Sequence, residues 1–436
     1  QWAPTPWLTE RHGYDPTCVE DGNVNKTEVE DKTDEELTNS KTYENWDNFN
    51  QYWDLSDGSL SLNVAKETVP YGTILVHKDA TNTGALFEAE GYTAIVGATA
   101  FDSMADALKA VRPGFTIVLC SDVTETEAMV VTDDLTILGN GNTITADECV
   151  GFYIQDDLNS FAVRDLTLEG VLPAGETAGE GGSGSFMGIG TYNDCCGVQD
   201  LELTNVTIDG FSYGLYFGKN PAGGNGPYNE NDVCLDAQNL TVQNCYIKGA
   251  YFEKLTDSTF TDCSFLDNGA DPARVQDGFQ SWMCGVDLNL KNGQYENISF
   301  EGCTFEGNGA NSGTALHIKA RDDGKYGGDT MLSGVFVTGC TFEDNNDQGK
   351  NYGPIVLGEA DKDNATPVNV HIQPDVHVTN NLDEDDVVCV TFDSKGGSEV
   401  NSLYVEAGSK IELPKPSKKG YTFLGWKSSA DRKVYK

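Results

Sequence analysis

Residues 317–331, HIKARDDGKYGGDTM, form the stretch of this 436-residue chain that is richest in side chains able to do acid, base or charge-stabilising chemistry. Its candidate groups are a histidine, two of its three cations and three aspartates, namely His317, Lys319, Arg321, Asp322, Asp323 and Asp329. The glycines at 324, 327 and 328 allow sharp turns that would bring the carboxylates back towards each other. Two carboxyl groups hydrolyse a glycosidic bond with retention at a separation of about 5 to 5.5 Å, and with inversion at about 6.5 to 9.5 Å. These residue types therefore point to glycoside hydrolysis.

The retaining separation is within reach of ordinary β structure, because neighbouring strands lie about 4.7 to 4.9 Å apart. Arg321 or Lys319 would hold one carboxylate ionised as a nucleophile, while burial or a like charge would raise the pKa of the other, the acid. The alternative is that Asp-Asp-Gly forms a solvated turn in a protein with 69 acidic side chains. The residues alone leave both interpretations open.

A second candidate cluster lies in ADPARVQDGFQSW, residues 270–282. Trp282 could stack on a sugar ring, with Gln280 and Arg274 donating to hydroxyl groups and Asp277 leading into the same segment. The alternative is a structural turn in which Arg274 pairs with a neighbouring acid. Tyr216 and His317 are weaker candidates for contact with a ligand.

The elements that must position these residues are visible as repeats. Six segments (163–171, 198–210, 237–249, 255–269, 295–309 and 332–346) alternate apolar and polar residues and end at Gly or Asn. Aligned, they place Val206, Cys245, Cys263, Cys303 and Cys340 in one column, with steps of 39, 18, 40 and 37 residues. Such repeats are typical of a right-handed parallel β-helix, whose coils stack to bury a common core. We expect the four cysteines to be buried, reduced thiols, since free cysteine packs as a small hydrophobe.

A second set of strands is predicted between the repeats, at 151–157, 214–220, 278–283, 315–323 and 354–361. Alternation in the fourth segment turns Leu316, Ile318 and Ala320 inward, and His317, Lys319 and Arg321 outward. The same rule turns Gln280 and Trp282 outward in the third segment, and Tyr216 outward in the second. Stacked, these strands would present an outer face of aromatic rings, amides, cations and carboxylates.

The remaining parts complete the predicted domain organisation. The spacing of apolar residues over 101–112 predicts an amphipathic helix capped by Asp102 or Ser103, followed by a strand within 113–123. Together they would cap the open end of the β-helix. We assign residues 71–385 to the β-helix and leave the structure of the polar segment 1–70 open.

Charge divides the chain. The net charge is −41, but residues 387–436 hold nine Lys or Arg and five Asp or Glu, which leaves 19 basic and 64 acidic residues before them. The acidic part disfavours binding to nucleic acid, and no apolar run is long enough to insert into a membrane. Residues 386–436 are a separate small domain. Through TFDSKGG, GSKIELPKP and KKGYTFLGW it resembles the Listeria–Bacteroides (internalin B-type) repeat, which implies export by a Gram-positive bacterium and association with the cell wall.

The β-helix with its HIKARDDG run, outward aromatic residues and surface module resembles the lacto-N-biosidases of glycoside hydrolase family 136. The resemblance implies a secreted enzyme of a gut bacterium that releases lacto-N-biose from milk or host glycans by a retaining mechanism. It assigns Asp322 as general acid/base and Asp329 as nucleophile, with Asp323 as the substitute for a register shifted by one. The seven-residue interval from Asp322 to Asp329 matches the family. Members of this family often carry a helical domain that aids folding. Residues 1–70 are too few for such a domain, which is a departure from the family pattern.

Two other functions stay open. A polysaccharide lyase would use Lys319 or Arg321 as base and hold calcium with Asp322, Asp323 and Glu359. Its uronate substrate would be repelled by the acidic chain unless the groove were locally cationic, so a neutral glycan fits better. A non-catalytic adhesin would use the outer aromatic residues to bind glycan. For the hydrolase we expect no required metal or cofactor, although the acidic surface could bind calcium incidentally.

Overall fold

The computed structural model describes most of the predicted β-helix and parts of the two ends. The described residues are 19–20, 23–24, 53–54, 61–62, 67–179, 186–219, 230–311, 313–321, 330–346, 354–358, 364–365, 368–372, 377–379, 387–390, 392–398, 400, 403–406, 413–429 and 432–435. The chain divides into two compact units, residues 1–123 and 124–436, which are described separately.

In the first unit, the parallel strands β5 (Thr73–Val76), β8 (Ala100–Phe101) and β9 (Phe115–Leu119) carry the helix α5 (Met104–Lys109). The Ser103 hydroxyl caps the helix by accepting from the Asp106 backbone N–H at 3.3 Å. The helix buries four residues, Met104, Ala105, Ala107 and Leu108, as the periodicity predicts. It is shorter than predicted, since Phe101 belongs to β8. The described residues of this unit also include three antiparallel strand pairs: β1 (Val19–Glu20) with β2 (Asn23–Val24), β3 (Trp53–Asp54) with β4 (Ser61–Leu62), and β6 (Leu86–Ala89) with β7 (Tyr92–Ile95).

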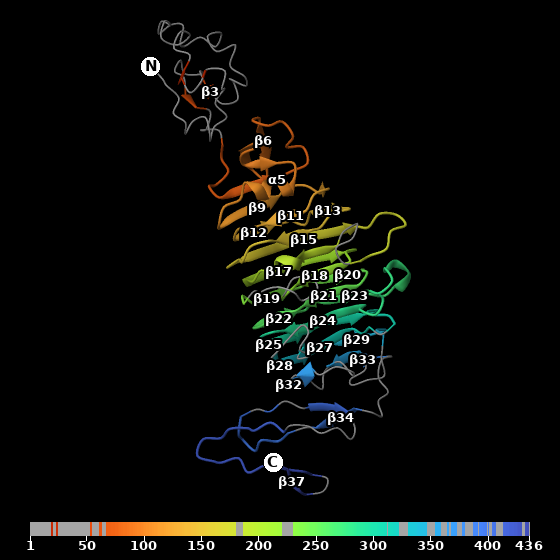
Figure 1. Ribbon diagram of the computed structural model, residues 1–436. Helices are drawn as coiled ribbons and strands as arrows, with labels where there is room; N and C mark the ends of the chain where they lie inside the picture. Colours follow the sequence, from red (N-terminus) through yellow and green to blue (C-terminus); the bar gives the residue numbers. More distant parts are fainter. Residues whose placement is uncertain are drawn as a thin grey trace. The chain divides into compact units, whose positions relative to one another are not determined.

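The second unit is built from two parallel sheets (Figure 1). The first, here called the β27 sheet, contains β11 (Met129–Val131), β14 (Phe152–Ile154), β16 (Met187–Gly190), β18 (Tyr213–Phe217), β21 (Lys248–Phe252), β24 (Cys284–Lys291), β27 (Leu316–Arg321) and β30 (Ile355–Leu357), with β31 (Asn364–Ala365) antiparallel to β27. The second, here called the long sheet, contains β10 (Val123–Glu125), β12 (Leu135–Leu138), β13 (Thr143–Asp147), β15 (Phe161–Val171), β17 (Val198–Asp209), β19 (Val233–Gln238), β20 (Thr241–Gln243), β22 (Ser258–Thr261), β23 (Ser264–Leu266), β25 (Gln294–Glu301), β26 (Thr304–Glu306), β28 (Met331–Thr338), β29 (Thr341–Glu343), β32 (Val368–Ile372) and β33 (His377–Thr379).

Strands one coil apart pair in parallel. Thus β24 pairs with β27, β25 with β28 and β26 with β29, so that each later coil repeats the path of the one before (Figure 1). This succession confirms the predicted parallel β-helix. Its interior is lined by stacked side chains, because in-register residues of adjacent coils lie above one another. Phe305 and Phe342 stack with ring centroids 4.5 Å apart, and Phe260 and Phe300 with centroids 4.7 Å apart.

The cysteine column needs one correction. Cys245, Cys263, Cys303 and Cys340 are buried and not disulfide-bonded, as expected. The last three also align as predicted, since Ser264 is in register with Thr304, and Thr304 with Thr341. However, Thr241 is in register with Ser264, which places Leu240 and not Cys245 opposite Cys263. The alignment matched cysteines by residue type, whereas the backbone register follows the corner of the coil.

Cys245 instead heads a column of buried asparagines, Asn268, Asn308 and Asn345. Asn308 donates its amide to the Phe265 carbonyl at 2.7 Å and to Asn345 Oδ1 at 2.9 Å. Its own Oδ1 accepts from the backbone and side-chain nitrogens of Asn268 at 3.1 and 3.0 Å. The ladder satisfies buried polar groups at one corner of successive coils.

The second set of predicted strands is confirmed at 151–157, 214–220, 315–323 and 354–361, where β14, β18, β27 and β30 lie. The prediction at 278–283 is wrong, because this segment forms turns and the strand β24 follows it. Phe279 does not enter the core of the coils but packs on an aromatic cluster with Tyr216 and Tyr251. The strand β21 is missed by the sequence pattern.

The C-terminal segment is also β-rich. Its hairpins are β34 (Val387–Val390) with β35 (Leu403–Glu406), and β36 (Trp426–Lys427) with β37 (Val434–Tyr435). The Trp426 ring contacts Phe392 and Phe423, at centroid distances of 4.7 and 5.4 Å, and its Nε1 donates to the Pro414 carbonyl at 2.6 Å.

Candidate active site

The outer face of the β27 sheet carries the predicted residues His317, Lys319 and Arg321. Their neighbours Leu316, Ile318 and Ala320 are completely buried in the core, which confirms the predicted alternation. On β24 the residues in register with these three are Asp287, Asn289 and Lys291. These side chains, together with Lys248, Tyr251 and Glu253 of the preceding coil, are called the outer-face network. Although they point away from the core, all but His317 are less than 9% exposed. Burying so many charges costs free energy unless they are paired. The ion pairs within the network therefore offset part of this cost.

Asp287 is the centre of one half of the network. Its Oδ2 lies 2.5 Å from the Lys248 ammonium, and its Oδ1 lies 3.3 Å from the Lys319 ammonium. Burial opposes ionisation of Asp287, but the adjacent Lys248 and Lys319 hold the pKa of its carboxyl well below the ordinary value. Lys248 also lies 4.2 Å from the centre of the Tyr251 ring. Asp287 is therefore a carboxylate that is ionised at neutral pH and held between two ammonium groups.

Glu253 is the centre of the other half. It accepts from the Lys219 backbone N–H at 2.9 Å and from the Tyr251 hydroxyl at 2.8 Å, and it pairs with the Lys291 ammonium. Asn289 donates to the Tyr251 oxygen at 2.7 Å and so joins this carboxylate to β24. Burial, followed by the charge of Glu253, raises the pKa of Tyr251 well above its ordinary value. Because Glu253 has several fixed donors, its carboxylate is suited to holding the network in place.

His317 is neutral in this setting. Burial and the neighbouring Lys319 ammonium lower its pKa to about 4. Its Nε2 lies 2.8 Å from the Gly358 carbonyl oxygen, which can only accept, so Nε2 carries the proton. Nδ1 then holds a lone pair, 4.0 Å from Asp287 Oδ1.

Tyr216 lies one coil from Tyr251 in the row that continues through Asp287 to His317. It points outward as predicted, but it is only 7% exposed. Its ring packs at centroid distances of 5.0 to 5.5 Å against four aromatic rings, those of Phe186, Tyr192, Tyr213 and Tyr251. The aromatic cluster therefore adjoins the outer-face network.

The second candidate cluster is a folded loop before β24. Asp271 caps the short 3₁₀ turn Pro272–Arg274, and Arg274 donates to the Tyr246 hydroxyl at 3.1 Å. Gln280 donates to the Pro272 and Val275 carbonyls at 3.0 and 3.2 Å, so its amide holds the loop together. Asp277 is exposed on the same loop. Trp282, 47% exposed and in edge-to-face contact with Phe279, is the ring that this loop presents to solvent.

The predicted catalytic residues Asp322, Asp323 and Asp329 lie outside the described residues, as does Glu359. β27 ends at Arg321, which is in register with Lys291. In the sequence, the three aspartates therefore follow a strand that carries part of the outer-face network. Within the ranges given above, no group of three or more His, Cys, Asp or Glu side chains is arranged to hold a metal ion.

Asp287 and Glu253 are not among the site residues predicted from the sequence. A signal for Asp287 does exist, since CGVDLNLK alternates apolar and polar residues in the same phase as LHIKAR. The pairing of Lys248 with Asp287, 39 residues apart, could not be inferred without the register of the coils.

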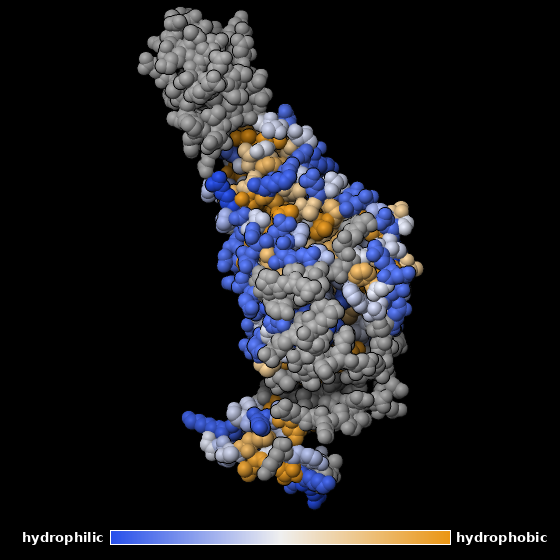
Figure 2. Space-filling model, in the orientation of Figure 1, coloured by the Kyte–Doolittle hydropathy of each residue, from blue (hydrophilic) through white to orange (hydrophobic). Residues whose placement is uncertain are grey.

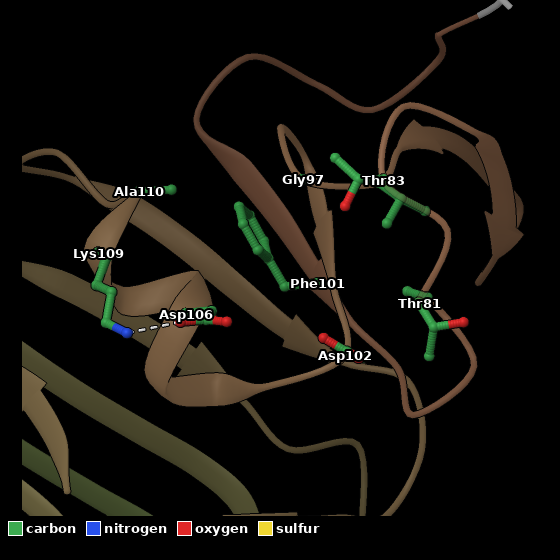
Figure 3. Close-up of a pocket in the computed structure, with 10 residues that line it drawn as sticks. Thr81, Thr83, Gly97, Phe101, Asp102, Asp106, Lys109 and Ala110 are labelled. Atoms are coloured by element: carbon green, nitrogen blue, oxygen red, sulfur yellow. Dashed lines mark hydrogen bonds and ion pairs between the residues drawn. The ribbon is translucent and has the colours of Figure 1, made fainter. Parts of the chain in front are cut away.

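A separate hollow lies on the described part of the first unit (Figure 3). It has a volume of about 370 Å³, with Phe101 at its wall and Thr81, Thr83 and Asp102 around it. Lys109 also lines it and pairs with Asp106 at 2.6 Å. None of the predicted site residues line this hollow.

Comparison with known families identifies the C-terminal segment of the chain. Residues 389–435 match the family model of the Listeria-Bacteroides repeat domain, which confirms the resemblance of the C-terminal domain. No curated protein matches the chain. Among solved structures, one titled as the crystal structure of pectate lyase Pel9A aligns with a TM-score of 0.38 and 14% sequence identity, over 83% of this chain and 96% of that one. No helix among the described residues is both long and apolar enough to cross a membrane.

Proposed function

We propose that this protein is a glycoside hydrolase whose active site lies at the C-terminal end of β27, beside the outer-face network. One observation carries the proposal. The acidic segment 322–329 follows directly in the sequence on a strand whose outward side chains, Lys319 and Arg321, are buried cations in a network with the carboxylates of Asp287 and Glu253. A cation next to a carboxylate keeps it ionised, which is the state a glycosidase nucleophile requires.

In this proposal Asp322 is the general acid/base and Asp329 the nucleophile, with Asp323 as the substitute in a shifted register. The Asp329 carboxylate attacks the anomeric carbon while Asp322 protonates the departing glycosidic oxygen, which leaves a covalent glycosyl–enzyme ester. Asp322, now ionised, then takes a proton from water, and the hydroxyl oxygen displaces Asp329. Configuration at the anomeric carbon is retained, because it is inverted twice.

The substrate is proposed to be a neutral host or milk glycan, most specifically one that ends in lacto-N-biose. Trp282 would stack on a sugar ring, since its exposed ring otherwise gains nothing from contact with water. Tyr216, His317, Gln280, Arg274 and Asp277 remain proposed contacts. In the structure the amide of Gln280 is occupied within its own loop, which favours a supporting role for this residue.

Charge at the site bears on the choice of substrate. The described part of the outer-face network holds four cations, Lys248, Lys291, Lys319 and Arg321, against the carboxylates of Glu253 and Asp287. The segment 322–329 adds Asp322, Asp323, Asp329 and Lys325, which would bring the balance to five cations and five carboxylates. Such a site has no excess of positive charge for a uronate polymer, and a neutral glycan suits it better.

The lyase is the less favoured alternative because of the state of its base. A lyase on this face would abstract a proton with Lys319 or Arg321. The Lys319 side chain lies 3.3 Å from the Asp287 carboxylate in an ion pair, and an ammonium group must leave such a pair and lose its proton before it can act as a base. An arginine guanidinium stays protonated at any ordinary pH.

We further propose that the protein acts at the cell surface after export and is held near the cell wall by its C-terminal domain. The Listeria-Bacteroides repeat match over residues 389–435 supports this location.

The test is hydrolysis of a panel of chromogenic glycosides that includes lacto-N-biosyl nitrophenol, with polygalacturonate as the lyase substrate and with and without chelator. Release of nitrophenol by the wild type, abolished in Asp322→Asn and Asp329→Asn, is the expected result. Asp236→Asn, an exposed aspartate on β19 of the long sheet, is the matched control and should retain activity. Chelator-sensitive formation of unsaturated products from polygalacturonate would contradict the hydrolase and support the lyase. If the wild type and all three variants bind glycan and none of them hydrolyses it, the result supports the non-catalytic adhesin.

A further inference from the structure

The charge of the C-terminal domain is opposite to that of the rest of the chain. Residues 387–436 carry nine basic and five acidic side chains, whereas the preceding residues hold 19 basic and 64 acidic ones. The cations concentrate further in the second half of the domain. In the described ranges 413–429 and 432–435 there are six cationic side chains and no acidic one, namely Lys415, Lys418, Lys419, Lys427, Arg432 and Lys433. These six are called the cationic cluster.

Large apolar side chains are exposed between these cations. Tyr421 is 74% exposed and Leu424 77%, and Val434 and Tyr435 are 58% and 46% exposed. Two contacts bring cations and apolar groups together. The Lys418 ammonium lies 5.0 Å from the centre of the Tyr421 ring, and Lys427 is in register with Val434 across the β36–β37 hairpin. Figure 2 shows hydrophobic and hydrophilic residues side by side on this domain.

The domain has its own fixed core, so this surface is presented by a folded module. Trp426 is held by Phe392, Phe423 and the Pro414 carbonyl. Lys418 donates to the Lys395 carbonyl at 2.6 Å, which anchors the loop that carries Tyr421. Exposed lysines with exposed apolar side chains between them suit a binding surface more than a solubilising one, because solubility needs no exposed rings.

We propose that the cationic cluster binds a flexible phosphodiester polymer of the cell envelope, of the polyol-phosphate kind. Five of its six cations are lysines, which bind phosphate as point charges and tolerate the irregular spacing of a flexible chain. The exposed rings would cover the apolar C–H groups of the polyol between phosphates. This inference rests on the cell-surface location proposed above and does not depend on what the β-helix hydrolyses.

The net charge of −41 does not by itself prevent this binding, because screening limits the reach of surface charges to about 8 Å at physiological salt. A local excess of positive charge on one module can therefore act within a strongly acidic chain.

The test uses the full chain and immobilised poly(glycerol phosphate), with neutral dextran as the blank and polygalacturonate as a second polyanion. The variant is Lys415→Glu with Lys419→Glu, two exposed lysines outside the Trp426 contacts. The matched control is Lys78→Glu with Arg112→Glu, exposed cations of the first unit that change the net charge equally.

We expect the wild type and the control to bind poly(glycerol phosphate) and the Lys415/Lys419 variant to bind at least about tenfold more weakly at 0.15 M salt. Loss of two phosphate contacts should also reduce the slope of log K against log salt by about 1.4. Failure of the wild type to bind, or equal weakening in the control, overturns the proposal. So does equal or tighter binding to polygalacturonate, because the site would then read charge without preference for phosphate. An unchanged thermal unfolding curve for the Lys415/Lys419 variant shows that any lost affinity is not caused by misfolding.

Discussion

Replacement of Asp287 by Asn tests whether the outer-face network is organised by ion pairs. The change keeps the shape of the side chain and removes its charge, so the ammonium groups of Lys248 and Lys319 lose the carboxylate between them. The three side chains are only 3%, 7% and 8% exposed, which means that water cannot compensate for the loss.

The structure sets the size of the effect. At an effective dielectric constant of about 20, unit charges at the observed 2.5 and 3.3 Å attract by roughly 7 and 5 kcal/mol. The cost of removing three charges from water offsets most of this sum, and breaking a buried pair by deleting one partner costs about 3 to 5 kcal/mol. We therefore expect the free energy of unfolding of Asp287→Asn to be about 3 to 5 kcal/mol lower than that of the wild type at pH 7.

The assay is urea-induced unfolding followed by circular dichroism at several pH values. The folded-state pKa of Asp287 is depressed, so its stabilisation is complete above the unfolded value of about 3.9 and declines as the pH falls below it. The difference between wild type and variant should narrow in that acidic range. Asp236→Asn should change stability by less than about 0.5 kcal/mol. A loss below about 1 kcal/mol for Asp287→Asn at pH 7, or a difference that is independent of pH, would refute the ion-pair account.

Three further outcomes follow from described contacts. Asn308→Ala should destabilise the protein by about 2 to 3 kcal/mol, because the Phe265 carbonyl and the adjacent asparagines lose buried partners, whereas Gln238→Ala on the exposed side of β19 should change little; urea unfolding compares the two. Burial lowers the pKa of Lys254 to about 8, so between pH 8 and about 10.4 the unfolded state binds more protons and this lysine makes the protein more stable as the pH rises. Lys254→Met should therefore remove a contribution of about 3 kcal/mol to the rise across that window, and an identical pH profile in both proteins would contradict the burial of the ammonium. Trp282→Ala should raise the KM for a cleaved glycoside about tenfold if the ring stacks on a sugar, and a KM no different from wild type would exclude the contact.

Much of the fold could be predicted because coils repeat and each strand alternates. The inward Leu316 and Ile318 and the outward His317 on β27 follow from a period of two alone. The same rule failed at 278–283, where the aromatic residues give a pattern like that of a strand although the segment forms turns. There Phe279 packs on the outer aromatic cluster through a turn, and sequence patterns do not distinguish that burial from burial in a core.

The site could be predicted only in part, for a different reason. Lys319 was identified as a cation of the face, but its partner Asp287 belongs to the preceding coil. The distance along the chain between paired residues depends on the length of the loop inserted in each coil. The Cys245 column was misassigned for the same reason, since its coil is shorter than its neighbours and residue type does not reveal the register.

The most direct test of the central claim is rescue by azide of Asp329→Ala and Asp322→Ala acting on an activated lacto-N-biosyl glycoside. Without its nucleophile, Asp329→Ala should give a glycosyl azide of inverted configuration, because azide attacks the anomeric carbon once. Asp322→Ala should give the azide of retained configuration, because azide then displaces the Asp329 ester. Inverted azide from Asp329→Ala together with retained azide from Asp322→Ala supports a retaining hydrolase in which Asp329 is the nucleophile and Asp322 the acid/base. If azide restores neither variant while both remain folded, or if both keep wild-type turnover without it, the acidic segment after β27 is not the catalytic site.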